Sequence, residues 1–293
     1  MYFSITFNKN MTQAIGLKEI CISEFESSLN RRHSKIDKLR QDAIDEFKKK
    51  GFPTTHDESW KHTSISKITQ TLFKPATQQA IPDYANKFIG GLALNEQNTA
   101  QNTVQLVFIN GFYSHELSSQ NHDTRIRVES LEMILGADDE HTSKLLEHLG
   151  SYAYYKNEVF TALNTAFVSD GAFVYIPRGV IVDKPIHIIY LSTESKALSN
   201  PRTLIIAEEN SQVSVIETYA GADELIYLTN AVTEINAGDN AIIDYYKLGL
   251  ESKRAFHVGA LHIAENNNSR ITAHSINLGG ELVRNNISSY LGG

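Results

Sequence analysis

Residues 161–191 read TALNTAFVSDGAFVYIPRGVIVDKPIHIIYL and contain three short runs of β-forming residues, at 173–176, 180–182 and 186–191. Corners separate the runs, because Gly accepts positive φ and Pro fixes φ at about −65°. The corner residues are Asp170-Gly171, Pro177 with Gly179, and 183–185. No gap holds a crossover helix or a two-residue Asn-Gly loop. Short strands joined by tight corners predict one coil of a β-solenoid.

The coil recurs further along the chain. Ile206, Ile235 and Ile263 each precede a polar turn rich in Asn, Asp, Glu or Gly, and a new β-forming run follows each turn. Ile235 follows Ile206 by 29 residues and Ile263 follows Ile235 by 28, which is a period typical of repeat proteins. Three loose copies also fit antiparallel strands of a β-sandwich, and that alternative stays open here.

Composition indicates a globular protein that is not built to bind polyanions. The chain has 293 residues, 41% hydrophobic and 21% charged, with a net charge of −7. Its basic run at 48–50 falls at a predicted helix end, so nucleic acid or an anionic membrane is not expected as the main partner. No apolar run approaches the roughly 18 residues of a membrane span. The first ten residues lack a signal-peptide pattern, and Met11 is an alternative start.

Cys21 is the single cysteine, which excludes internal disulfides and predicts a cytoplasmic location. One thiol cannot form a four-thiolate site for zinc or an iron–sulfur cluster. The sequence patterns of phosphate loops, dinucleotide-binding turns, serine-hydrolase elbows and HExxH metalloproteases do not occur. We therefore predict no catalytic residues, no metal ligands and no enzyme activity, and the sequence identifies no cofactor-binding residue.

Residues 12–75 are predicted to be helical. The clearest helix has a capping-box pattern at Ser34 and Asp37, and Gly51 ends it. Its expected apolar face consists of Ile36, Leu39, Ala43, Ile44 and Phe47. A second capping-box pattern, at Thr55 and Glu58, opens a short helix through Trp60. We interpret Trp60 as an anchor in the core or between domains.

Residues 76–103 are rich in Gln, Asn, Ala and Gly and predict a linker. A strand follows at 104–109, the Asn110-Gly111 pair predicts a turn, and 112–114 its hairpin return. Another strand is expected at 125–128. Asp139 should then cap a helix that ends at Gly150. The apolar residues expected to face inward on that helix are Leu145, Leu146 and Leu149.

These elements divide the chain into an extension (1–11), a helical region with its linker (12–100) and a mainly β solenoid core (101–293) with a helical insert near 139–149. Residues 285–293 look like the middle of another coil. An open coil leaves an unpaired strand edge. We therefore expect the chain to stop short of its natural end, or another subunit to cover that edge.

Two groups of polar residues in the solenoid are candidate sites. His257, His262 and His274 could ligate a metal or handle protons if neighbouring coils bring them together, but nothing in their spacing fixes such a geometry. The favoured interpretation is ordinary strand histidines. Asp170 is a possible acid in a cleft, but Asp before Gly is more often a turn former. Asn210, Asp239 and Asn267 recur as turn formers or as a stacked ladder.

Taken together, several motifs resemble the SufD family, within the SufB/SufD group of iron–sulfur cluster assembly proteins. Between residues 52 and 285 these motifs occur in the same order as in members of the family. The combination is therefore specific for the family, although no single motif is. SufB is the alternative within the group. The matching stretches are Phe52-Pro53-Thr54, Glu58-Ser59-Trp60-Lys61-His62-Thr63, Val107-Phe108-Ile109-Asn110-Gly111, Ser114, Leu117-Ser118, Ala162-Leu163-Asn164-Thr165-Ala166, Asp170-Gly171, Tyr175-Ile176-Pro177-Arg178-Gly179-Val180, Lys184-Pro185-Ile186-His187-Ile188, Leu278-Gly279-Gly280 and Arg284-Asn285.

The resemblance implies a right-handed parallel β-helix behind an N-terminal helical region. It also implies a scaffold subunit that pairs with a SufB-like subunit and a SufC-like ATPase, or with a second copy as a homodimer. A nascent cluster or a flavin would be held only within the full complex. Members of the family continue into further coils, a C-terminal helical segment that docks the ATPase, and a later histidine linked to cluster formation. None of these is present here, so weak ATPase binding is expected.

Two other classes remain as alternatives. A carbohydrate-active β-helix enzyme would usually be secreted and carry clustered carboxylates in a groove, and neither feature is evident here. A structural or adhesive solenoid would not need the helical region or the motif around Trp60.

Overall fold

The computed structural model describes residues 16–27, 34–92, 104–119, 121 and 123–292, so the extension expected at 1–11 lies outside the described residues. The α-helices are α1 (Leu17–Ser27), α2 (Asp37–Lys50), α3 (Ser66–Gln70), α4 (Tyr84–Leu92), α5 (Leu131–Gly136), α6 (Glu140–His148) and α7 (Val159–Phe167), with 3-10 turns η2 (Ser34–Ile36) and η3 (Glu58–Trp60). The strands are β1 (Lys74–Pro75), β2 (Gln105–Ile109), β3 (Phe112–Tyr113), β4 (Arg127–Ser130), β5 (Ala172–Ile176), β6 (Ile186–Ser192), β7 (Ala197–Ser199), β8 (Arg202–Ala207), β9 (Gln212–Gly221), β10 (Leu228–Ala237), β11 (Ile242–Leu250), β12 (Phe256–Glu265), β13 (Arg270–Asn277) and β14 (Leu282–Leu291).

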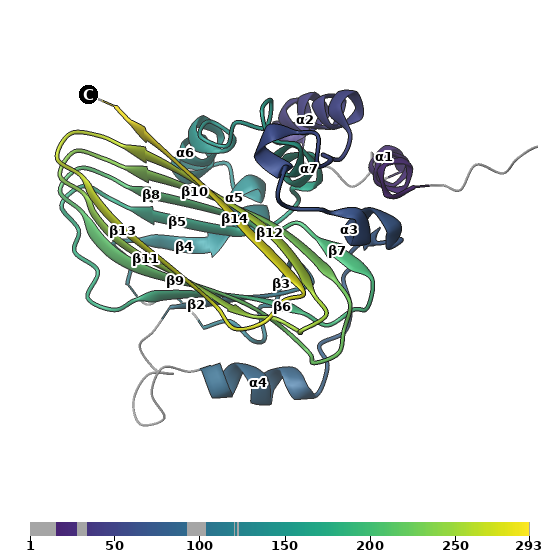
Figure 1. Cartoon of the computed structure of the whole chain (residues 1–293). Coiled ribbons are helices and arrows are strands. Elements are labelled where there is room, and N and C mark those ends of the chain that lie inside the picture. The colour runs from purple at the N-terminus through teal and green to yellow at the C-terminus, as the bar shows by residue number, and fades with distance from the viewer. Residues whose placement is uncertain (1–15, 28–33, 93–103, 120, 122, 293) are drawn as a thin grey trace, which may run out of the picture.

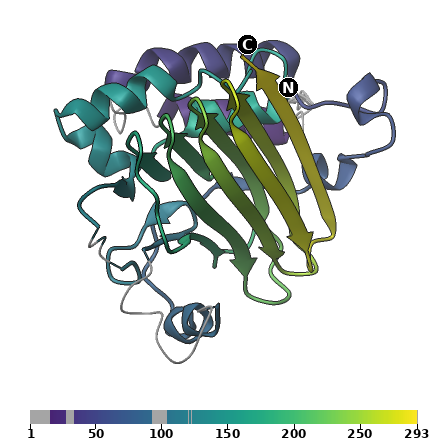
Figure 2. The same cartoon turned by 90° about the vertical axis from the view of Figure 1, so that its left-hand side faces the viewer.

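The strands form a parallel β-solenoid of two facing sheets, which confirms the predicted fold (Figure 1). In the first sheet, β8, β10, β12 and β14 pair in parallel, each with the strand one coil later. In the second, β6, β9, β11 and β13 do the same. Figure 2 shows the later strands side by side, from green to yellow. Alternate residues of each strand point into the space between the sheets, which we call the lumen.

The register of the coils corrects the predicted repeat by one residue. Ile205, not Ile206, pairs with Ile235, and Ile235 pairs with Ile263. These three side chains belong to the apolar core of the lumen, whereas Ile206 packs outward against helices. Because β8 is buried on both faces and Leu204, Ile205 and Ile206 are all apolar, the sequence pattern does not reveal which of these side chains point inside.

Asparagine makes the same corner in three successive coils. Asn210, Asn240 and Asn268 adopt left-handed φ of 58°, 58° and 55°. Asn240 Nδ2 also donates to Asn210 Oδ1 at 3.0 Å, so part of the corner is a stacked amide ladder. The predicted residues were Asn210, Asp239 and Asn267. Asn210 is one of the corner residues, whereas Asp239 and Asn267 lie one residue before the left-handed position. They form a second step of the ladder, because the amide and Nδ2 of Asn267 donate to Asp239 Oδ1 at 3.1 and 3.4 Å.

We expect Asn240→Ala to lower the free energy of unfolding by about 1–2 kcal/mol, because a β-carbon without the amide is disfavoured at positive φ. Asn240→Gly is the matched control, since glycine accepts this φ, and should change stability by less than about 1 kcal/mol. Urea denaturation followed by far-UV circular dichroism measures both. Equal losses in the two variants would contradict a conformational role for Asn240.

One predicted strand of the 161–191 stretch is absent from the structure, and a helix that was not predicted opens the stretch. Residues 180–182 form no strand, and Ile181 makes only an isolated parallel bridge to Gln212. The beginning of the stretch is part of helix α7, whose buried face includes Asn164. A run of three β-branched residues with Gly before it and Asp after it is too short to build a ladder of its own.

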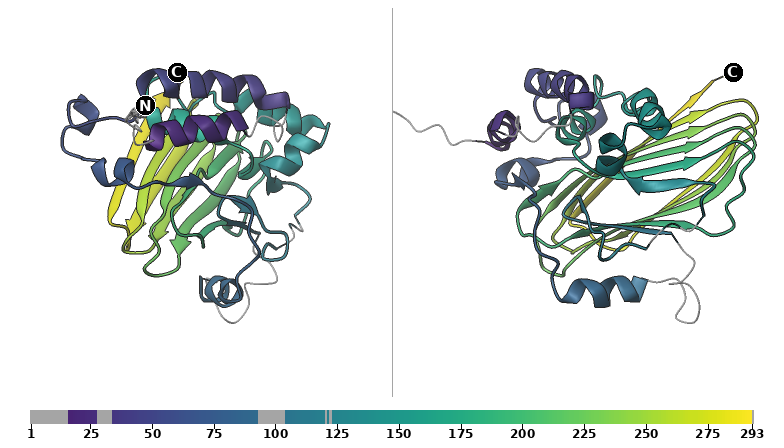
Figure 3. Two further views of the ribbon diagram at one scale, coloured as in Figure 1. Left: turned by 90° about the vertical axis from the view of Figure 1, so that its right-hand side faces the viewer. Right: turned by 180° about the vertical axis from the view of Figure 1, so that it is seen from behind.

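The N-terminal helices cover the outer face of the first sheet (Figure 3). Helices α1, α2 and α7 share one apolar cluster with Leu228, Phe256 and Val258 of the sheet. Trp60 belongs to this cluster and is 7% exposed. Its ring lies 5.3 Å from the ring of Phe160 and 4.1 Å from the Arg284 guanidinium carbon of β14. Trp60 is therefore an anchor between the helical region and the last described coil, as predicted.

The second sheet is covered in part by a helix that the sequence analysis missed. Residues 76–103 were expected to form a linker, but α4 occupies Tyr84–Leu92 below β2 and β6 in Figure 1. Ala85 and Ile89 are buried against Val107, Ile189 and neighbouring residues. Gly90 and Gly91 conceal this helix in the sequence, because glycine is unfavourable within helices.

Helix caps were predicted with mixed success. Asp139 caps α6 through the amides of His141 and Thr142, as expected. Helix α2 begins at Asp37 without a side-chain cap, so the Ser34 capping box is wrong.

The capping box predicted at Thr55 and Glu58 is also wrong, because η3 has no side-chain cap. The Asp57 carboxylate instead accepts hydrogen bonds from the amide and the hydroxyl of Thr54. On α6, Leu145 is buried, but Leu146 is 40% exposed, contrary to the predicted inward face. The Asn110-Gly111 hairpin turn between β2 and β3 is confirmed.

Candidate functional site

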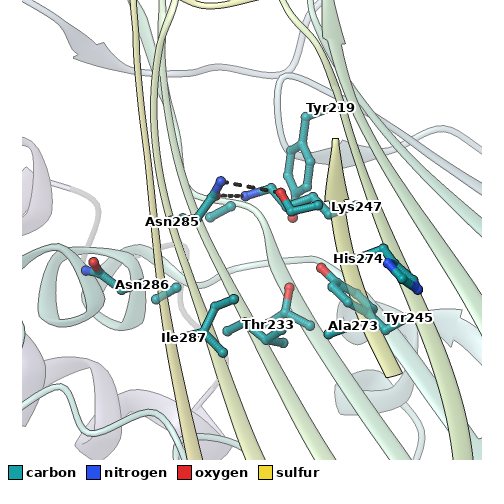
Figure 4. Close-up of a pocket in the computed structure, with 14 residues that line it drawn as sticks. Tyr219, Thr233, Tyr245, Lys247, Ala273, His274, Asn285, Asn286 and Ile287 are labelled. Atoms are coloured by element: carbon teal, nitrogen blue, oxygen red, sulfur yellow. Dashed lines mark hydrogen bonds between the residues drawn. The ribbon is translucent and has the colours of Figure 1, made fainter. Parts of the chain in front are cut away.

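The lumen changes from apolar to polar along the strands, and the polar end is the candidate site. On β11, Ile243 packs in the apolar core, Tyr245 follows at its margin and Lys247 lies in the polar end. All three point the same way because side chains two residues apart share one face of a strand. The pairing partners of Lys247 are Glu217 on β9 and Ser275 on β13. Figure 4 shows Lys247 and Asn285 of β14 pointing toward each other across the lumen.

Glu217 is a fully buried carboxylate held by hydroxyl groups. Tyr219 and Tyr245 donate to its Oε2 at 2.9 and 2.5 Å, and Thr233 donates to the same atom at 3.0 Å. Burial, and next to it the Glu217 charge, raises the pKa of both tyrosines well above the usual range. Both phenols therefore remain protonated donors at all physiological pH values.

We expect Tyr245→Phe to lower the free energy of unfolding by about 1.5–3 kcal/mol, because it removes a hydrogen bond to a buried charge. Tyr246→Phe is the matched control. Tyr246 lies on the outer face, where it stacks on His274 with ring centroids 5.3 Å apart, so its loss should cost less than about 0.5 kcal/mol. Urea titration measures both variants. If the two substitutions cost the same, the hydroxyl of Tyr245 does not support Glu217.

Lys247, His257 and Glu251 form a second buried group. Lys247 Nζ lies 2.6 Å from His257 Nε2 and 2.5 Å from Asn285 Oδ1. His257 Nδ1 lies 2.9 Å from Glu251 Oε2. The other oxygen of this carboxylate, Oε1, accepts a hydrogen bond from the Thr229 hydroxyl at 2.7 Å. Burial lowers the pKa of Lys247 to about 8, although the charges of Glu217 and Glu251 act in the opposite direction. Burial, followed by the Lys247 charge, also lowers the pKa of His257.

An aromatic row extends from this group through the earlier coils of the lumen, on β9, β6 and β2. The rings of Phe108, Tyr190 and Tyr219 stack in turn, with centroids 4.9 and 5.2 Å apart. The His257 ring meets Tyr219 edge-on at 4.9 Å, and Lys247 Nζ lies 5.1 Å from the same ring. These contacts fix the orientation of the imidazole and the amine.

The structure separates the three histidines that were considered as a possible metal site but interpreted as ordinary strand histidines. His257 and His262 both lie on β12, but His262 faces Ser288 of β14 rather than His257. His274 is exposed on β13. Across the described ranges, no cluster of three or more His, Cys, Asp or Glu side chains has a geometry suited to a metal ion.

Asp170 is a buried turn former. Its carboxylate accepts from the amides of Tyr113 at 2.9 Å, Gly171 at 2.8 Å and Glu132 at 3.2 Å, which joins a hairpin, a strand and the start of α5. Burial raises its pKa to about 6.

Cys21 is buried on α1, and burial raises the pKa of its thiol to about 12. A protonated, enclosed thiol is a poor metal ligand. Among the described residues, no helix is both long and apolar enough to cross a bilayer.

Lys247, Glu217 and Glu251 were not among the residues predicted from the sequence. A usable signal was present for Lys247, because the alternation of Ile243, Tyr245 and Lys247 places a charge on an otherwise apolar face.

Two family models match the chain in succession. Residues 22–188 match the N-terminal region of SufBD proteins, and residues 190–293 match the SufBD core domain of the SUF system for FeS cluster assembly. An iron–sulfur cluster assembly SufBD family protein from Synechocystis sp. is 30% identical over 259 residues, covering 85% of this chain and 55% of the relative. The iron–sulfur cluster assembly protein SufD of Escherichia coli is 23% identical over 257 residues, covering 86% and 55%.

A chloroplastic protein of Arabidopsis thaliana, ABCI7, is 26% identical over 261 residues, covering 86% of this chain and 52% of the relative. The chain thus spans about half the length of these curated relatives.

Proposed function

Because the chain belongs to the SufBD family of iron–sulfur cluster assembly proteins, we propose that it acts as a SufD-like, non-catalytic scaffold subunit of an assembly complex. The observation that carries this proposal is the succession of the two family matches, which together run from residue 22 to residue 293. Relatives named SufD, from Escherichia coli and Bacillus subtilis, favour the SufD side of the family.

The proposed partners are a SufB-like subunit and a SufC-like ATPase, with a second copy of the chain as an alternative partner, in the cytoplasm. Iron, sulfide or a flavin would be held only within that complex. The architecture supports a scaffold, because parallel strands covered by helices on one sheet give a rigid body with long surfaces. Its single cysteine is buried and protonated, so the partners would supply the thiolates.

Co-purification tests this proposal. The tagged chain is co-expressed with SufB-like and SufC-like subunits, the complex is isolated, and its iron and acid-labile sulfide are measured. Stable capture of the SufB-like subunit, with iron and sulfide in the complex, is expected. Failure to capture either partner with a chain that shows a folded circular dichroism spectrum would contradict the proposal.

We expect Cys21→Ala to leave the iron and sulfide content of that complex unchanged within experimental error. The thiol is enclosed in an apolar cluster and its pKa is raised to about 12, so it does not act as a thiolate ligand. Thermal melting of the isolated variant controls for the small cavity that the substitution creates. A loss of at least half of the iron with the fold intact would show that Cys21 is a ligand.

A further inference from the structure

The hydrogen-bond partners of Lys247 match a neutral amine better than an ammonium ion. Nζ faces two acceptors, His257 Nε2 and Asn285 Oδ1. The Glu251 carboxylate beside Nδ1 favours the tautomer in which Nδ1 carries the proton and Nε2 accepts. A neutral amine has two N–H donors for these two acceptors, whereas the third N–H of an ammonium ion has no partner among the described residues. The neutral form leaves a lone pair directed away from both acceptors.

Lys247 also lines a cavity at the polar end of the lumen. The cavity is about 30 Å³ in volume, enough for a molecule of two or three heavy atoms. Thr233, Tyr245 and Ala273 line it beside Lys247. Its wall on β14 includes Ile287, which is 62% exposed, so the cavity lies next to the surface.

The charged and titratable groups around Lys247 come from several neighbouring strands. Glu217 on β9 and Glu251 after β11 favour the cation, as does the Tyr219 ring. His257 on β12 is neutral when it accepts, whereas the His274 ring of β13 stacks on Tyr246 on the outer face. Burial outweighs the two carboxylates and lowers the pKa of Lys247 to about 8. About a fifth of the amine is then neutral at pH 7.4, against about one in a thousand for an ordinary lysine.

We propose that Lys247 is a covalent capture site for small aldehydes, which enter the lumen cavity and form an imine with Nζ. The nitrogen lone pair forms the C–N bond while the carbonyl π bond breaks. Both amine protons end on the carbonyl oxygen, which departs as water, and His257 Nε2 is placed to relay them. The step is a condensation, so it needs no oxidant or reductant.

Formaldehyde is the probe, because its two heavy atoms fit the cavity. The chain is incubated with formaldehyde and dimethylamine–borane, which reduces the imine to a stable methylamine, and peptide mass spectrometry gives the rate at each lysine. Lys253, exposed and six residues away, is the internal control. Lys247 should be methylated at least about tenfold faster than Lys253 at pH 7.4, with a rate that rises with pH and levels off above about 8.

Gly259→Ala tests the geometry without changing a charge. A β-carbon at Gly259 would overlap Lys247 Nζ and lie about 2.9 Å from His257 Nε2, so the amine must leave its acceptors. We expect the rate at Lys247 to fall at least about fivefold while Lys253 is unaffected. His257→Gln is the second variant, in case the first fails to fold, and should slow Lys247 similarly. A wild-type rate at Lys247 equal to or below that of Lys253 overturns the proposal, as does an unchanged rate in a folded variant.

Discussion

Glu234→Gln is expected to lower the free energy of unfolding by about 3–5 kcal/mol, because it breaks a buried ion pair and leaves its partner charged. Glu234 and Arg202 are both fully buried, with Oε1 and Nη2 2.5 Å apart. The same carboxylate accepts from the amides of Gly150 at 2.9 Å, Tyr152 at 3.0 Å and Ala153 at 2.9 Å. A glutamine would point its own N–H groups at two of these four donors.

This pair joins the solenoid to its helical cover. Arg202 on β8 also donates to Asn164 Oδ1 at 2.9 Å and to Thr165 Oγ1 at 3.1 Å, both on α7. Gly150, Tyr152 and Ala153, whose amides donate hydrogen bonds to Glu234, come directly after the end of α6. Loss of the pair therefore weakens contacts of two helices with the first sheet at once.

Glu209→Gln is the matched control for this prediction. Glu209 pairs with Arg178 at 3.1 Å, but both side chains are exposed, so the substitution should cost less than about 1 kcal/mol. Urea denaturation of both variants, and a double-mutant cycle of Glu234→Gln with Arg202→Met, give the comparison. A coupling energy above about 1 kcal/mol is expected, and a Glu234→Gln loss as small as that of Glu209→Gln would contradict the prediction.

Trp60→Ala is expected to lower the free energy of unfolding by about 3–5 kcal/mol and to release the last described strand. The indole packs against Phe160, and Arg284 of β14 lies over it. Arg284 also donates to the Ser59 carbonyl at 2.8 Å, so the indole and the backbone beside it hold this guanidinium in place. Without the ring, Arg284 loses its stacking surface and the cluster gains a cavity.

Hydrogen exchange distinguishes this local effect from a general loss of stability. Amides of β14 should lose protection in Trp60→Ala, while those of β9 and β11, which belong to the second sheet, should keep more of theirs. Trp60→Phe is the conservative control and should retain most of the protection. Uniform loss along all coils would contradict a specific role of Trp60 at β14.

The sequence predicted those features that depend on local residue chemistry. The corner glycines and prolines, the Asn110-Gly111 hairpin and the Asp139 cap act within a few residues, so their patterns are visible in the chain. The sequence did not reveal which face of β8 points inward, because Ile205 and Ile206 are both apolar and both buried. Only the opposing sheet and the helices outside decide between them.

The lumen site was missed for a similar reason. Lys247 meets His257 and Asn285 through pairings between coils, and single residues in separate strands carry no sign of their partners. The resemblance to a known family supplied the architecture, but it gave no role to these side chains. Helix α4 was missed because its short apolar face is followed by Gly90 and Gly91.

The contact between Trp60 and Arg284 has a consequence for synthesis of the protein in the cell. Hydrogen bonds join the Trp60 segment to a residue more than 220 positions later. At ribosomal rates of about 5–20 residues per second, roughly 10–45 s pass between synthesis of the Trp60 segment and synthesis of β14, which carries Arg284. During that interval the indole and neighbouring apolar side chains lack their final cover. Slowly translated synonymous codons before residue 284 would lengthen this interval. A chaperone that binds exposed aromatic segments would therefore bind the nascent chain rather than the folded protein.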